Sequence, residues 1–274
     1  MANTGARLAF YGVRGSVPTP GKTTARVGGN TSCVEVQTGG KARIVFDAGT
    51  GLRELGRTLI HAPETEVHIL LSHYHWDHML GLPFFAPIFH PRSRLHIYGE
   101  RKDGGGPREA MIRQFAAPHF PVVFDLIESH VTFHEVAVGD KFRIGQASVV
   151  VGKLNHPQGA IAYRVNTGGK SVVYASDHEH DGTGDGPLVE FAHKANALIY
   201  DAMFTDETYG QKRGWGHSTW QEAIRVAKAA GVRNLYLFHH DPIHDDKTMD
   251  AIGRRARKLF AGATVAREGL VVKL

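Results

Sequence analysis

Short apolar runs rich in Val, Ile and Tyr recur along the chain, and glycine, proline or asparagine residues separate them. This pattern is typical of β-strands. It predicts strands over residues 7–13, 31–36, 43–46, 66–71, 95–98, 131–136, 142–154, 160–165, 171–175, 197–200, 234–238 and 264–272.

Helical periodicity is clearest over residues 218–230 and 245–260, and a capping box can start the first of these helices at Ser218 or Thr219. The strands come in runs, with helices between only some of them. Two mixed sheets covered by outer helices therefore fit the pattern better than one doubly wound parallel sheet. The glycine-rich stretches 103–107 and 181–187 are too short to be linkers, so we expect one domain over residues 1–274.

Composition narrows the classes of protein that fit. The chain has 274 residues, of which 42% are hydrophobic and 22% charged, as in an ordinary globular protein. No apolar run is long enough for a membrane helix, and no apolar signal core follows Met1, so we expect a cytoplasmic protein without membrane contact. The net charge of +5 mildly favours anionic partners. One cysteine, Cys33, stands against 18 histidines, so imidazole and carboxylate groups must supply the ligands of any transition metal.

The decisive segment is Leu-Leu-Ser-His-Tyr-His-Trp-Asp-His, residues 70–78, at the end of an expected strand. Alternate side chains of an extended segment share a face, so His73, His75 and Asp77 can converge, and a turn adds His78. Two imidazoles suit one transition-metal ion, and a carboxylate beside another imidazole suits a second. The alternative is a chance group of histidines on a solvated loop.

The segment matches in full the His-x-His-x-Asp-His signature of the metallo-β-lactamase fold superfamily, which the chain resembles over nearly its whole length. That resemblance implies a four-layer αββα sandwich with metals at the shared edge of the two sheets. It also implies ligands beyond the signature. The implied first ion is held by His73, His75 and His156, the second by Asp77, His78 and His239, with Asp177 bridging them and Asp47 supporting the site.

Three further histidines are left open by the sequence. His240 competes with His239, because adjacent side chains on a strand point to opposite faces. His178 and His180 follow Asp177 and either line the pocket or lie on a solvated loop.

Two more segments resemble the ribonuclease Z and phosphodiesterase branch of this superfamily. They are Ile-Tyr-Asp-Ala-Met-Phe, residues 199–204, and Gly-Trp-Gly-His-Ser-Thr, residues 214–219. Asp201 replaces the usual Glu that pairs with the histidine matched by His217. A carboxylate bound to one imidazole nitrogen favours the cation, so the other nitrogen can hold a phosphate oxygen or protonate a leaving alkoxide. Ser218 and Thr219 are expected to seat phosphate at a helix N-terminus, and Arg14 to add a further contact.

The resemblance implies a dinuclear metal-dependent hydrolase, and we expect a phosphodiesterase that cleaves a small phosphodiester or cyclic nucleotide through metal-activated hydroxide. Asp77, His217 and Asp201 are the expected catalytic residues. The ions are expected to be Zn, although Mn or Fe also suits these ligands. RNA is less favoured as a partner, because no basic arm is evident between His78 and His156, and a homodimer is compatible with the sequence. The alternatives are a ribonuclease Z-like endonuclease, a hydrolase of carboxylic esters, thioesters or lactones, and a non-catalytic metal sensor.

Overall fold

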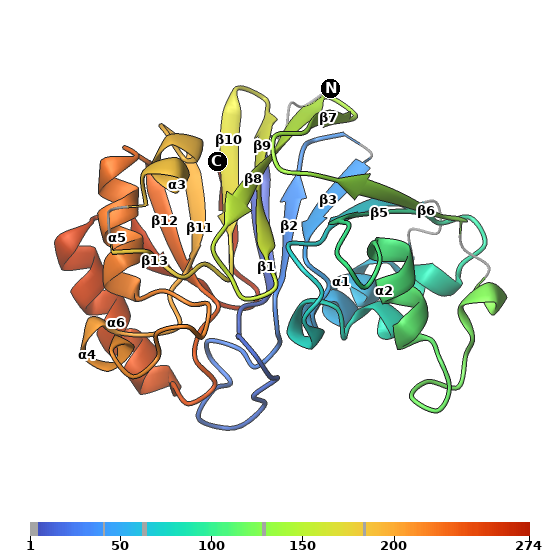
Figure 1. Cartoon of the computed structure of the whole chain (residues 1–274), viewed down its shortest axis with the longest axis horizontal. Coiled ribbons are helices and arrows are strands. Elements are labelled where there is room, and N and C mark those ends of the chain that lie inside the picture. The colour runs from blue at the N-terminus through green and yellow to red at the C-terminus, as the bar shows by residue number, and fades with distance from the viewer. Residues whose placement is uncertain (1–4, 41, 62–64, 128–129, 183–184) are drawn as a thin grey trace.

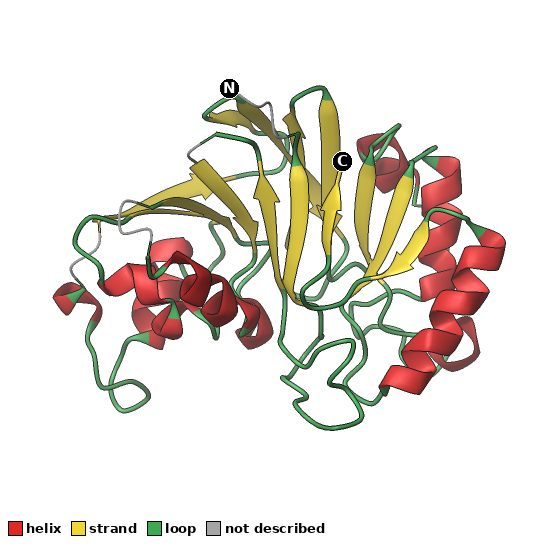
Figure 2. Cartoon of the chain, turned by 180° about the vertical axis from the view of Figure 1, so that it is seen from behind, coloured by secondary structure: helices red, strands yellow, loops and turns green. Residues whose placement is uncertain are grey.

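Two seven-stranded sheets stand face to face at the centre of the molecule, and helices cover their outer faces (Figure 1, Figure 2). The computed structural model describes residues 5–40, 42–61, 65–127, 130–182 and 185–274. The first sheet has the strand order β14-β1-β2-β3-β4-β5-β6, and the second has the order β13-β12-β11-β10-β9-β8-β7. Both contain parallel and antiparallel pairs, so the predicted αββα sandwich of two mixed sheets is confirmed.

The strands of the first sheet are β1 (Arg7–Gly12), β2 (Cys33–Gln37), β3 (Ala42–Phe46), β4 (Glu66–Leu70), β5 (Arg94–Glu100), β6 (His130–Val136) and β14 (Val271–Lys273). Those of the second are β7 (Lys141–Ile144), β8 (Ala147–Leu154), β9 (Ala160–Thr167), β10 (Lys170–Ala175), β11 (Ala197–Asp201), β12 (Asn234–Phe238) and β13 (Ala263–Val265). The α-helices are α1 (Gly51–Leu59), α2 (Pro107–Gln114), α3 (Gly186–Phe191), α4 (Asp206–Tyr209), α5 (Trp220–Ala229) and α6 (Asp246–Leu259). Four short 3₁₀ turns are η1 (Trp76–His78), η2 (Leu82–Phe84), η3 (Ala86–Phe89) and η4 (Phe124–Leu126).

Two expected strands are in fact pairs of strands. The segment expected as one strand over 142–154 reverses at Gly145, whose φ of 55° lies in the left-handed region that glycine adopts without steric cost, and it forms β7 and β8. The segment expected over 264–272 divides into β13 and β14, which belong to different sheets. The two expected C-terminal helices form as α5 and α6, and Thr219 rather than Ser218 caps α5.

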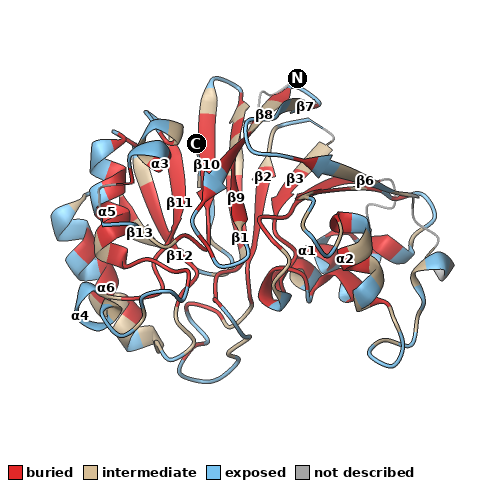
Figure 3. Ribbon diagram, viewed as in Figure 1, coloured by how far each residue is buried: buried red, intermediate tan, exposed pale blue. Residues whose placement is uncertain are grey.

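The core has two parts, because each sheet presents one face to the other sheet and one to helices (Figure 3). Between the sheets, Phe46 of β3 stacks on Tyr174 of β10 with 4.8 Å between ring centroids. Outside the first sheet, Leu52 and Leu55 of α1 pack with Val67 of β4. Within the described parts of the chain, no helix combines the length and hydrophobicity needed to cross a bilayer.

Strand direction gathers the polar side chains at one edge of the sandwich. In the first sheet β3 and β4 are parallel, and in the second β10, β11 and β12 are parallel. Asp47 follows β3, Asp177 follows β10, Asp201 ends β11 and His239 follows β12. The carboxyl ends of parallel strands meet at the same edge, so residues far apart in the sequence come together there.

Candidate metal centre

The signature segment leaves β4 in an extended conformation and then turns. His73 and His75 come first, and the 3₁₀ turn η1 carries Asp77 and His78. His73, His75, His156 and Asp177 form one cluster, in which one ligating atom from each lies within 4.8 Å of the others. Nδ1 of His75 lies 3.3 Å from Nε2 of His156, and Nε2 of His73 lies 3.6 Å from Oδ2 of Asp177.

A second cluster of the same kind joins Asp77, His78, His239 and Asp177. Nε2 of His78 and Nε2 of His239 each lie 3.1 Å from Oδ2 of Asp77 and 3.2 Å from Oδ1 of Asp177. Asp177 therefore presents one oxygen to each cluster, which is the placement that a bridging carboxylate requires. The structure brings together all seven residues predicted as metal ligands.

The chemistry of these side chains fits divalent cations. Nε2 of His73 is buried and has no hydrogen-bond partner among the described residues, which is costly unless another group binds it. Burial lowers the pKa of His73 and of His156, which favours the neutral imidazole that a metal binds. Burial alone would also lower the pKa of His78, but the charges of Asp177, Asp77 and Asp47 outweigh it and raise that pKa. This excess of buried negative charge is what a cation would balance.

Asp47 contacts His78 on the nitrogen away from the cluster, in the supporting place that the family resemblance implies. Its Oδ2 lies 2.7 Å from Nδ1 of His78 and accepts hydrogen bonds from Tyr174 at 2.6 Å and from the Ser72 hydroxyl at 2.9 Å. Its Oδ1 accepts from the Ser72 backbone N–H at 2.7 Å. These hydrogen bonds fix the Asp47 carboxylate in place. Asp47 in turn orients His78 through Nδ1, so that Nε2 of His78 faces the second cluster.

Backbone strain concentrates at the same edge. Asp47, Asp177 and His239 have φ values of 56°, 57° and 57°, in the left-handed region that non-glycine residues seldom adopt. Each such residue costs on the order of 1–3 kcal/mol, and such strain clusters at functional sites. Each of the three follows a buried strand directly or within two residues, so the strain turns a polar side chain toward the clusters.

The loop after β1, which carries Arg14, Gly15 and Ser16, contributes through its backbone rather than through Arg14. The N–H of Ser16 donates to Oδ2 of Asp77 at 2.8 Å, and a Cβ on Gly15 would lie 2.5 Å from the ring of His239, so only glycine fits there. Arg14 is fully buried and donates to the carbonyls of Gly28, Asp241 and His244. The expectation that Arg14 contacts phosphate is therefore wrong, because the side chain is fully buried and its Nε and Nη1 donate to the protein's own backbone.

His217 and Asp201 pair beside the clusters. Nδ1 of His217 lies 2.8 Å from Oδ2 of Asp201 and 4.0 Å from Oδ2 of Asp177. Burial opposes the charge on His217, but Asp201 outweighs it and raises the pKa of the imidazole to about 9. The shorter Asp thus makes the contact expected of the family's Glu, and it favours the imidazolium form.

The three histidines that the sequence leaves open contact other groups. Nε2 of His240 lies 2.8 Å from the carbonyl of Ala266. His178 is buried, with Nε2 3.3 Å from Asp185, and His180 stacks on Tyr209 with 4.2 Å between ring centroids. Within the described chain, these three histidines belong to none of the clusters.

The predicted phosphate seat at the start of α5 does not form from hydroxyl groups. Ser218 and Thr219 are fully buried. The Ser218 hydroxyl donates to the carbonyl of His178 at 2.5 Å, and the Thr219 hydroxyl donates to Asp206 at 2.6 Å. The expectation is wrong because these hydroxyls are already used to fix the segment that carries His217.

Sequence reasoning missed Glu179, which orders the loop against His156. Its carboxylate accepts hydrogen bonds from the N–H groups of Gly214 at 2.6 Å and Gly216 at 2.8 Å. The carbonyl of Gly216 lies 2.8 Å from Nδ1 of His156, so this loop fixes which nitrogen of His156 faces the cluster. The only signal in the sequence was the closeness of Glu179 to Asp177 along the chain.

A cavity of about 570 Å³ opens beside the first cluster. His73 and His75 form part of its wall, and Arg101, Lys102 and Arg113 bring positive charge to it. Glu100 pairs with Lys102, and Asp103 also lines the cavity. The positive and negative charges in its wall therefore partly offset each other. The size suits a small ligand, and the net charge of these side chains favours an anion.

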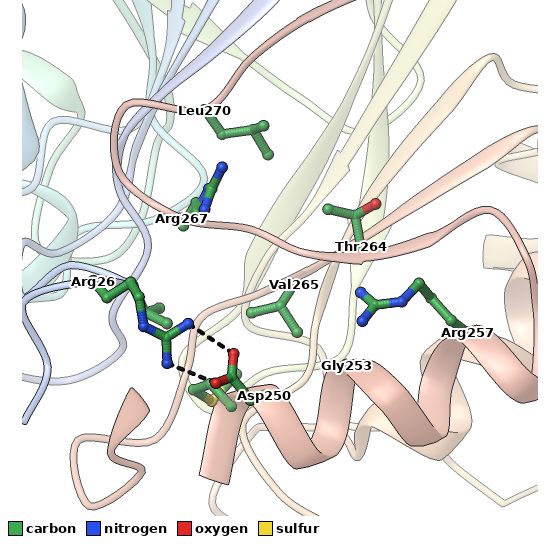
Figure 4. A pocket seen from close by; sticks show the side chains of 10 residues that line it. Arg26, Asp250, Gly253, Arg257, Thr264, Val265, Arg267 and Leu270 are labelled. Carbon is green, nitrogen blue, oxygen red and sulfur yellow. Dashed lines mark hydrogen bonds and ion pairs between the residues drawn. The ribbon is translucent and has the colours of Figure 1, made fainter. Parts of the chain in front are cut away.

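A smaller cavity of about 200 Å³ lies against α6 (Figure 4). Arg26 pairs there with Asp250 at 2.7 Å, and Arg257 and Arg267 also line it. Arg255, on the same helix, instead pairs with Glu207 at 3.0 Å. The basic side chains of α6 thus have different partners, and none of the described residues lining this cavity belongs to either metal cluster.

Comparisons with known proteins agree with this fold. The model of a family described as the beta-lactamase superfamily domain matches residues 42–240. A ribonuclease Z from Picrophilus torridus is 22% identical over 98% of this chain and 96% of its own length. Among solved structures, the metallo-beta-lactamase fold protein YhfI from Bacillus subtilis has a TM-score of 0.74 at 22% identity, covering 98% of this chain and 99% of its own. A diphosphatase from the PhnP family has a TM-score of 0.73 at 20% identity, covering 98% of each chain.

Proposed function

The chain belongs to the beta-lactamase superfamily as a metal-dependent hydrolase, and we propose that its substrate is a small phosphodiester. The predicted superfamily and enzyme class are confirmed. The substrate class is our proposal, and the observation that carries it is the buried pair of His217 and Asp201 beside Asp177.

The seven side chains would hold two ions. His73, His75 and His156 would bind the first, Asp77, His78 and His239 the second, and Asp177 would bridge them. When bound, the two ions would activate water for attack and offset the negative charge of the phosphoryl oxygens. We propose zinc for both positions, although manganese or iron also suits imidazole and carboxylate ligands.

Three residues would move or hold protons. Asp201 holds Nδ1 of His217 and keeps its imidazole protonated, so Nε2 can donate to a phosphoryl oxygen or to the leaving alkoxide. Asp77, held in place by the N–H of Ser16, would accept a proton from the attacking water. The leaving alkoxide needs the proton of His217, because an alkoxide is a far poorer leaving group than the corresponding alcohol.

The neighbouring cavity supports a small anionic substrate. Its volume of about 570 Å³ falls within the range of small-molecule sites, and Lys102 and Arg113 lie in its wall. A cyclic nucleotide or a similar phosphodiester is compatible with this size.

RNA cleavage is the second candidate, because curated relatives such as the protein of Picrophilus torridus are named ribonuclease Z. Hydrolysis of a carboxylic ester, thioester or lactone could use the same metal clusters. A thioester would need the proton of His217 less, because a thiolate leaves without one.

Four substrates tested on the zinc-loaded protein separate these activities: bis(p-nitrophenyl) phosphate, a cyclic nucleotide, p-nitrophenyl acetate and a transfer RNA precursor. We expect kcat/KM for the aryl phosphodiester to exceed that for the aryl ester by at least about 10-fold after correction for the uncatalysed rates. Turnover of the ester with no turnover of either phosphodiester would contradict the proposal. Cleavage of only the RNA precursor would favour the endonuclease, and activity on none with both ions bound would favour a sensor.

A further inference from the structure

A separate group of metal-ligating side chains lies toward the start of β4, while the signature segment follows its end. Glu66 and His68 belong to β4, and His96 belongs to the neighbouring strand β5. One ligating atom from each lies within 4.8 Å of the others. Glu66 and His68 are two residues apart on one strand and share a face, and His68 is directly paired with His96. We call Glu66, His68 and His96 the β4–β5 cluster.

The distances suit a single ion. Oε1 of Glu66 lies 3.2 Å from Nε2 of His68 and 3.9 Å from Nε2 of His96. Around a tetrahedral ion with bonds of about 2.0–2.1 Å, neighbouring ligand atoms lie roughly 3.3 Å apart. The first separation already matches this value, and the second exceeds it by a few tenths of an ångström.

Each imidazole is oriented by a protein group on its other nitrogen. Nδ1 of His68 lies 3.1 Å from the hydroxyl of Tyr98, and Nδ1 of His96 lies 3.1 Å from Nε2 of His134. Metal-bound histidines are usually held in this way, since a partner on one nitrogen fixes the tautomer and directs the other toward the ion. Burial also lowers the pKa of His68 and of His96, which favours the neutral, ligating form.

Binding requires one ring to turn. The rings of His68 and His96 are stacked, with 4.4 Å between centroids and 8° between planes, so their nitrogens do not yet point to a common centre. His68 is nearly enclosed, with 8% of its side chain exposed, whereas the side chains of His96 and Glu66 are 23% and 42% exposed. His96 and Glu66 can therefore move, and an ion can enter on their side.

We propose that the β4–β5 cluster binds one divalent transition-metal ion, separate from the dinuclear centre. Two imidazoles and one carboxylate suit zinc, copper or nickel better than magnesium or calcium, and water would complete the coordination. The bound ion would cross-link two adjacent parallel strands of the first sheet. The proposal does not depend on which substrate the dinuclear centre hydrolyses.

Calorimetric titration with Zn²⁺ tests it on protein whose dinuclear centre is already filled with zinc, as verified by elemental analysis. Wild-type protein should bind one further equivalent. Glu66→Gln and His96→Asn should each weaken that step at least about 10-fold. Glu190→Gln, which removes a charge from an exposed position on α3, should leave it unchanged.

Elemental analysis after dialysis should still find two tightly held zinc ions in every variant, and circular dichroism should confirm the fold. Both substituted side chains are partly exposed, so they are replaceable without disrupting the core, and Glu66→Gln alone suffices if His96→Asn does not fold. The proposal is overturned if the zinc-loaded wild-type protein binds no further ion. It is also overturned if the further equivalent persists with wild-type affinity in Glu66→Gln.

Discussion

Asp201 and His217 form a buried pair in which Oδ2 of the carboxylate lies 2.8 Å from Nδ1 of the imidazole. The same imidazole nitrogen lies 4.0 Å from Oδ2 of Asp177, the carboxylate shared by the two candidate metal clusters. The pair is thus close enough to act on a group bound at the centre. Among the described residues, one ligating atom each of Asp201, His217, Asp177 and His239 lie within 4.8 Å of one another. Nδ1 of His217, however, contacts the Asp201 carboxylate.

Replacing His217 should separate chemistry from metal binding. His217→Ala removes the proposed proton donor and none of the seven proposed ligands, so we expect kcat to fall by about 10²–10⁴-fold while zinc content stays at two per chain. Steady-state kinetics on a cyclic nucleotide, whose leaving alkoxide needs that proton, measures the first quantity, and elemental analysis measures the second. His193→Ala, at an exposed position, is the matched control and should change neither. Loss of zinc from a folded His217→Ala protein would show that the residue serves the metals instead.

Replacing Asp201 should change the pH dependence of hydrolysis. The Asp201 carboxylate raises the pKa of His217 to about 9, against the effect of burial. A proton donor works below its pKa, so activity should fall as pH rises through that value. In Asp201→Asn the amide carries no charge, so the pKa of His217 falls and the high-pH limb of kcat/KM should move to lower pH. Bound cations would lower the pKa in both proteins without reversing this order. An unchanged limb would exclude His217 as its source.

The spacing of the signature segment predicts four members of the candidate centre, His73, His75, Asp77 and His78. They lie within six consecutive residues, whose local conformation decides where the side chains point. The more distant members came from the resemblance to a family. No periodicity links His156 to the loop at Gly216, since that contact spans 60 residues and arises only from how the sheets pack.

The errors have the same physical origin. Arg14 and Ser218 are polar residues in loops, and the sequence alone cannot tell whether their donors face a ligand or the protein's own carbonyls. Both turn out to be fully buried and bound to backbone oxygens. The division of 142–154 into β7 and β8 was missed because apolar residues continue on both sides of Gly145.

Asp47 should tune metal affinity although it lies behind His78. In Asp47→Asn the carboxylate that accepts from Tyr174 and Ser72 and holds Nδ1 of His78 loses its charge. Residues that orient a metal-bound histidine typically contribute 10–100-fold in affinity, so we expect zinc binding to weaken by about that factor. Competition with a chromophoric chelator measures it. Asp125→Asn, at an exposed position, should bind zinc as the wild-type protein does. Equal affinities for the two variants would contradict a supporting role for Asp47.

Lys102 should affect substrate binding more than turnover. It lies in the wall of the cavity beside His73 and His75, where it can contact an anionic substrate, although it shares its charge with Glu100. Because that pair is partly exposed, we expect Lys102→Gln to raise KM for a cyclic nucleotide by about 10-fold or less, with kcat nearly unchanged. Lys170→Gln, at the start of β10, should leave both constants unchanged. A fall in kcat at constant KM would place Lys102 in the chemical step instead.

Two glycines of the loop 214–216 offer a test of how His156 is held. Gly214 and Gly216 have φ values of 84° and 87°, so alanine strains the backbone at either position by on the order of 1 kcal/mol. Only at Gly216 would the new Cβ also collide with His156, 2.2 Å from its Nδ1, whereas nothing lies within 4 Å at Gly214. We therefore expect Gly216→Ala to displace His156 and to lose zinc from the first cluster together with activity, while Gly214→Ala keeps both. Thermal unfolding shows whether the two variants are equally strained. If they lose zinc to the same extent, backbone strain is the cause, and the contact between this loop and His156 does not control metal binding.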